Sequence, residues 1–153
     1  MERTLNVERD KAEVLRRLGL LRLDSPRKWG QMSPHQTICH LIDSTLVALG
    51  DLTVSRFDTL FTRTVMKWIA LKAPVAWPQG IRTSPEIDQV RGCGTRPADF
   101  PADVARLEDL TQRFAAERNF TGRVHPIFGE MSADDWLRWG YLHLDHHLRQ
   151  FGV

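Results

Sequence analysis

The 153-residue chain has only two cysteines, has no long apolar run, and carries charges that nearly cancel. Cys39 and Cys93 stand too far apart for a CxxC motif or a disulfide framework, which favours a reducing compartment, the cytoplasm. No stretch approaches the roughly 20 apolar residues that span a bilayer, so we expect no membrane partner. The net charge of +2 is too small for a typical nucleic-acid binder, so we expect no nucleic-acid partner.

The remaining composition is that of one ordinary globular domain, which we expect to cover residues 1–153. Apolar residues make up 42% of the chain, enough for a single core without covalent staples. Apolar residues recur at helical spacing in five segments, and no strand-like alternation is present. The pattern therefore predicts an all-α fold, with four long helices around one core and one shorter helix. The expected helices cover residues 7–21, 33–49, 56–72, 101–117 and 132–151.

Local signals set several of the expected boundaries. Ser33-Pro34-His35-Gln36 combines an N-cap serine, a proline in the first turn and a capping-box glutamine, and Gly50 follows the last periodic residue. Asn6 is the expected N-cap of the first helix. Residues 74–101 contain many prolines and glycines and predict a long irregular crossover, a kind of segment that often carries function.

Histidines cluster in the last expected helix. His143 and His147 are four positions apart, which places them on one helical face about 6 Å apart. Such a pair can bind one cation if another element supplies a third ligand. A simpler interpretation is that these histidines and Arg149 only complement the negative end of the helix dipole. His40 in the second helix is the candidate third ligand, although the helical wheel places it opposite the apolar stripe, where it would be exposed.

Three motifs together resemble the DinB-like (YfiT-like) superfamily of metalloenzymes, in a bacterial branch of unknown function. The resemblance covers nearly the whole chain and implies a four-helix bundle with a long crossover, holding a divalent metal with three histidines. Carried over to this sequence, the ligands are His40, His143 and His147. The motifs are Trp29-Gly30-Gln31-Met32-Ser33-Pro34 leading to Cys39-His40-Leu41-Ile42-Asp43, then His125-Pro126-Ile127-Phe128-Gly129, and His143-Leu144-Asp145-His146-His147-Leu148-Arg149-Gln150-Phe151.

Members of the superfamily that resemble this chain include thiol-dependent S-transferases and isomerases. The expected function is therefore a metal-dependent enzyme in which the metal activates a small thiol or water for attack on a small electrophile. Zinc is the usual metal for imidazole ligands, and nickel, iron and manganese also fit this donor type. One alternative is a non-catalytic metal- or ligand-binding protein in a stress response, and another is a metal-free bundle with a protein partner. The sequence is also compatible with a homodimer.

Several neighbours of the expected ligands are candidates for the pocket or for orienting an imidazole. Acidic residues near a ligand can accept an imidazole N–H, although exposed helix acids are the simpler interpretation for both candidates. Cys39 is expected to be a small buried side chain rather than a ligand. The candidates are Asp43, His125, Trp136, Asp145 and His146.

Overall fold

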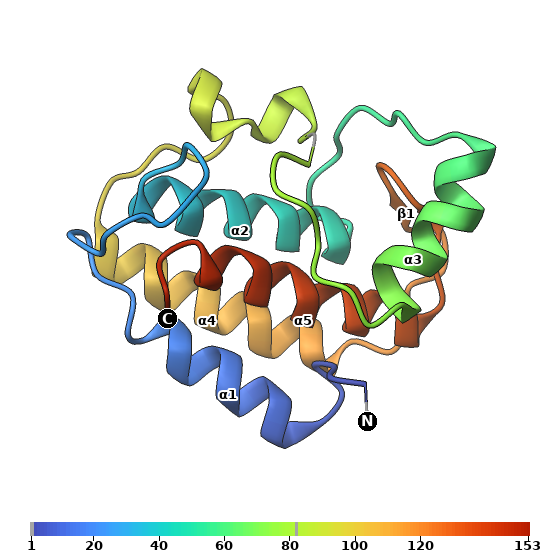
Figure 1. Ribbon diagram of the computed structural model, residues 1–153, viewed down its shortest axis with the longest axis horizontal. Helices are drawn as coiled ribbons and strands as arrows, with labels where there is room; N and C mark the ends of the chain where they lie inside the picture. Colours follow the sequence, from blue (N-terminus) through green and yellow to red (C-terminus); the bar gives the residue numbers. More distant parts are fainter. Residues whose placement is uncertain (1, 82) are drawn as a thin grey trace.

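The computed structural model describes residues 2–81 and 83–153 and is mainly α-helical. The four longer helices lie side by side, with α1 and α5 running in one direction and α2 and α4 in the other (Figure 1). Helix α2 packs chiefly on α4, and α1 packs chiefly on α5. Their bounds are α1, Glu8–Leu18; α2, Pro34–Leu49; α4, Phe100–Ala116; and α5, Ala133–Arg149.

Shorter elements occupy the connections. A π-helical turn, η1 (Thr62–Met66), continues into α3 (Lys67–Lys72), which contacts α5. Two 3₁₀ turns, η2 (Pro85–Ile87) and η3 (Gln89–Arg91), pack on α2 and are the regular part of the expected crossover. A two-stranded antiparallel hairpin, which the sequence pattern did not predict, pairs β1 (Val124–His125) with β2 (Gly129–Glu130).

Capping side chains explain where three of the long helices begin. Ser33 and Gln36 form the predicted capping box of α2, and Gly50 ends the helix in the left-handed conformation. Asp99 accepts the backbone N–H of Ala102 at the start of α4, and Ser132 accepts that of Asp135 at the start of α5. Each such cap satisfies a backbone donor that would otherwise lack a partner.

Three expected helices are shorter than predicted, and the last of them, α5, ends at Arg149 rather than at residue 151. Helix α1 has Val7 rather than Asn6 as its N-cap and ends at Leu18, because residues 19–21 form tighter turns instead of continuing the helix. The third helix begins near residue 60 rather than 56, because Thr59 and Thr62 exchange side-chain-to-backbone hydrogen bonds there. Upstream of this start, the N–H of Phe57 donates to the carbonyl of Pro126 in the hairpin.

One apolar core joins the long helices. Helix α2 is buried on both sides, facing the core on one side and the crossover on the other. In the part of the chain that the structure describes, no helix is both long and apolar enough to cross a membrane. The largest fully buried side chains of the core are Trp136, Phe114, Leu18, Ile38, Leu41, Ile42, Leu71, Leu107, Leu137, Leu148 and Val14.

Gly140 lies where α5 packs closely on its neighbours, so a substitution at this position measures how tight that packing is. A Cβ at this position would overlap the Phe114 ring and the Leu5 side chain. We expect Gly140→Ala to lower the free energy of unfolding by about 1–3 kcal/mol in urea denaturation, because overpacking outweighs the gain in helix propensity. Gly19→Ala is the control, since the nearest atom to its Cβ lies at 3.5 Å. Equal stability of the two variants would contradict this packing.

Candidate metal centre

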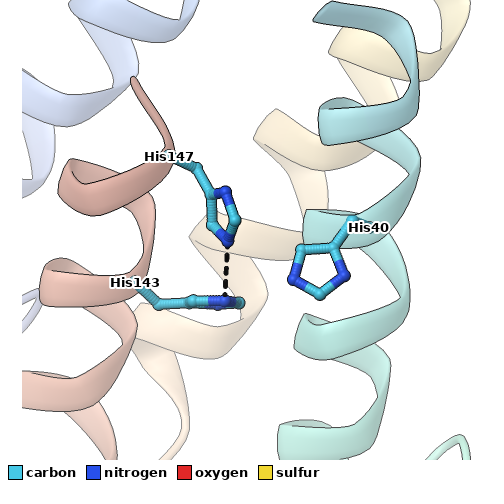
Figure 2. A group of neighbouring side chains, drawn as sticks. All are labelled: His40, His143 and His147. Atoms are coloured by element: carbon cyan, nitrogen blue, oxygen red, sulfur yellow. Dashed lines mark hydrogen bonds between the residues drawn. The ribbon is translucent and has the colours of Figure 1, made fainter. Parts of the chain in front are cut away.

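His143 and His147 project from one face of α5 toward each other, as their spacing predicts. Their Nε2 atoms lie 3.2 Å apart, and the two rings meet edge to face (Figure 2). His147 is buried, whereas His143 is partly exposed. One helix thus supplies two imidazole nitrogens to a common point.

His40 of α2 faces the same point. Its ring centroid lies 5.3 Å from that of His143 and 4.9 Å from that of His147, and Figure 2 shows the three rings converging from two helices. The side chain is buried, so the exposed position indicated by the helical wheel is wrong. The crossover is the physical reason, because η2 and η3 cover this side of α2.

The donor set fits a divalent cation. Each of the three histidines offers a ring nitrogen, and these atoms all lie within 4.8 Å of one another. Two nitrogens bound tetrahedrally to zinc at 2.0–2.1 Å are about 3.3–3.4 Å apart, which is close to the 3.2 Å between His143 and His147. Three imidazoles leave a coordination position for another donor, as in catalytic rather than closed structural sites.

The three imidazoles are held in the neutral form that binds metals. Burial lowers the pKa of His40, and burial followed by repulsion from the other histidines lowers the pKa values of His143 and His147 well below the ordinary value. Each ring therefore keeps a lone pair for a cation at neutral pH, since a protonated imidazole cannot act as a ligand.

Two acceptors orient the ligand rings. His147 donates from Nδ1 to Oε1 of Gln150 at 2.8 Å, and His40 donates from Nδ1 to the carbonyl oxygen of Ile87 at 3.4 Å. A ring with its proton on Nδ1 presents the lone pair of Nε2. Partners of this kind fix the tautomer and raise the basicity of a metal-binding histidine.

Asp43 acts on the site through the crossover. Its buried carboxylate accepts hydrogen bonds from the backbone N–H and hydroxyl of Thr95, at 2.8 and 2.6 Å, and from the side chain of Gln89 at 3.4 Å. Gly94, at φ +81°, lets the backbone approach this carboxylate, which a Cβ there would overlap. Asp43 thereby anchors the segment whose Ile87 carbonyl orients His40.

Three other residues that the sequence suggested as pocket or orienting residues do not contact the triad through a hydrogen bond: Asp145, His146 and Trp136. Asp145 pairs with Arg17 at 2.6 Å and with Arg149 at 3.6 Å, rather than with a ligand ring. The rings of His146 and Trp29 meet edge to face, and His146 lines a cavity between α5 and the segment after α3. Trp136 is fully buried in the core, where it stacks on Phe120.

His125 organises the hairpin turn. Its Nδ1 accepts the backbone N–H groups of Ile127 and Phe128, each at 3.1 Å, and its ring stacks on Phe128. The proton of the neutral ring therefore sits on Nε2. His125 therefore shapes the turn of the hairpin, directly before Pro126.

Residues that the sequence reasoning missed complete the surroundings. The ring of Trp139 stacks on His143 at 4.7 Å, and Trp77 from the crossover lies over His143 and His146. Trp139 stands four residues before His143 and Gln150 three residues after His147, so helical spacing could have identified both. No comparable signal exists for Trp77 or Ile87, which reach the site from an irregular segment.

The fold and the site define a mainly α-helical protein with a buried histidine triad that could hold a metal. The chain belongs to the family described as "Protein of unknown function (DUF1569)", whose family model matches residues 2–152. No curated protein and no solved structure matches the chain.

Gln150 provides a test of ring orientation. We expect Gln150→Leu to weaken zinc binding about 10–100-fold, because the Nδ1–H of His147 loses its acceptor. Titration against a chromophoric zinc chelator measures the affinity. Gln150→Glu is the matched control, since it keeps an acceptor at the same reach. Wild-type affinity in the leucine variant would show that this hydrogen bond does not prepare the ligand.

His125 provides a test of stability against pH. Burial lowers its pKa to about 3, whereas an unfolded histidine has a pKa of about 6.5. The unfolded chain therefore binds the extra proton, and the contribution of His125 is complete above about pH 6.5 and is lost as the pH falls toward 3.

We expect His125→Asn to reduce the slope of unfolding free energy against pH by about 1 kcal/mol per pH unit between about pH 5 and 6. Asparagine can accept a backbone N–H in a turn but does not titrate in this range. Urea denaturation of the metal-free proteins at each pH measures the slope. The other histidines are common to both proteins, so parallel curves would contradict a buried neutral His125.

Proposed function

We propose that this protein is a metal-dependent enzyme of the DinB-like type, in which His40, His143 and His147 hold a divalent metal, most simply zinc. The observation that carries the proposal is the convergence of three neutral imidazoles from two helices on one point. The arrangement of α1, α2, α4 and α5 also supports the four-helix bundle that the resemblance implies.

The proposed reaction is transfer of a small thiol to a small electrophile, or hydrolysis of that electrophile. A divalent cation bound there would lower the pKa of a thiol or water in its remaining position, which supplies a nucleophile at neutral pH. The chain keeps the ligand rings uncharged by burial. Gln150 and the Ile87 carbonyl hold two of the rings in orientation.

The surroundings favour a small substrate. A cavity of about 220 Å³ between α5 and the segment after α3 is lined by Trp77, Leu142, His146 and Arg149 among others, and the triad histidines are not part of its lining. Its volume is smaller than the roughly 300–1,000 Å³ of sites for drug-sized ligands. Trp77 contacts His146 in this cavity and His143 in the triad, so it borders both. We infer that small reactants enter along this tryptophan.

The test combines metal content with turnover. We expect His40→Ala, His143→Ala and His147→Ala each to remove about one metal equivalent per chain and to abolish turnover in a screen of thiols with small electrophiles, because each removes a ligand. Elemental analysis uses protein prepared without a histidine tag or chelator. Circular dichroism checks that each variant stays folded.

His146→Ala is the matched control for metal content, since this adjacent histidine is outside the triad and should leave the metal in place. Retention of that metal equivalent in the three ligand variants would overturn the assignment of the site. A wild-type protein that binds metal but turns over no thiol and electrophile pair would instead favour the non-catalytic binding protein.

A further inference from the structure

A second group of metal-binding side chains lies on another side of α2. His35 and Cys39 are four residues apart on this helix, and Asp103 faces them from α4. The Nε2 of His35 is 2.7 Å from Oδ2 of Asp103, and the Sγ of Cys39 is 4.0 Å from the same oxygen. The potential ligand atoms of all three residues lie within 4.8 Å of one another.

The three side chains are arranged on their helices in the same way as the histidine triad. One helix contributes an i, i+4 pair, and a neighbouring helix contributes the third donor. Cys39 is fully buried, and the side chains of His35 and Asp103 are only 13% and 14% exposed. Because adjacent helical positions point about 100° apart, Cys39 and His40 direct their side chains to different sides of α2. The two groups are therefore separate.

We propose that His35, Cys39 and Asp103 form a second divalent-metal site, selective for zinc-like cations. Imidazole, thiolate and carboxylate are all zinc ligands, and the two anionic donors balance the charge of a divalent ion in a buried position. This site differs chemically from the histidine triad, since a thiolate favours softer metals. The inference does not depend on the proposed enzymatic function.

Binding requires a defined exchange of protons. In the structure the Cys39 thiol donates its proton to Oδ2 of Asp103 at 4.0 Å. On binding, the thiol proton passes to solvent and the thiolate becomes a ligand. The proton that His35 shares with Asp103 through Nε2 in the structure moves by way of solvent to Nδ1, so that Nε2 offers its lone pair to the cation.

Cobalt(II) provides a spectroscopic test, because a thiolate bound to cobalt gives a near-ultraviolet charge-transfer band that imidazoles and carboxylates do not give. We expect this band when Co²⁺ is added to the full chain. Cys39→Ser should abolish the band, and His35→Gln or Asp103→Asn should weaken cobalt binding at this site. Zinc content should fall by about one equivalent in each variant.

Two controls separate this site from other sources of the signal. Cys93→Ser should keep the band, since Cys93 is the exposed cysteine far along the crossover. His143→Ala should also keep it while removing metal from the histidine triad, so failure of one proposal is distinguishable from failure of the other. Absence of the band in the wild-type protein, or its loss only with Cys93→Ser, would show that His35 and Asp103 form a metal-free link between α2 and α4.

Discussion

The simultaneous burial of two sides of α2 is the constraint on which the rest of the structure depends. One side of the helix fills the apolar core, and the other places His40 opposite the histidine pair of α5. That second side is buried only because the crossover lies over it. The buried carboxylate of Asp43 holds the crossover there through Thr95. A polar contact one turn along α2 from His40 thus helps to determine how this ring is enclosed.

The sequence predicted those features that arise from short-range geometry. The capping box at Ser33 and the glycine at residue 50 set the bounds of α2, because their hydrogen bonds and backbone angles are local. The spacing of His143 and His147 places both rings on one face of any regular helix. The mainly helical class follows in the same way from the periodicity of apolar residues.

Features that arise from contacts between distant segments could not be predicted in this way. A helical wheel cannot reveal that the crossover covers His40, so it indicated an exposed side chain. The short hairpin depends on His125 accepting two backbone N–H groups. The sequence around His125 resembles an ordinary loop and does not indicate these hydrogen bonds. Trp136 is buried in the core, whereas Trp139 stacks on His143 of the triad. Trp139 stands one helical turn before His143, so spacing could have identified its role, whereas the stacking of Trp136 on Phe120 arises from another segment.

The last turn of α5 links the candidate ligand His147 to the residues that follow the helix. Gln150, which orients that ring, is the C-cap of the helix, and helix ends open more readily than their centres. The backbone N–H of Lys28 donates to the carbonyl of Gln150, and the Arg17 side chain donates to the carbonyl of Val153, which holds this end in place. Opening of this last turn would withdraw the acceptor of the His147 ring, so the orientation of this candidate ligand depends on contacts that Lys28 and Arg17 make with residues 150–153.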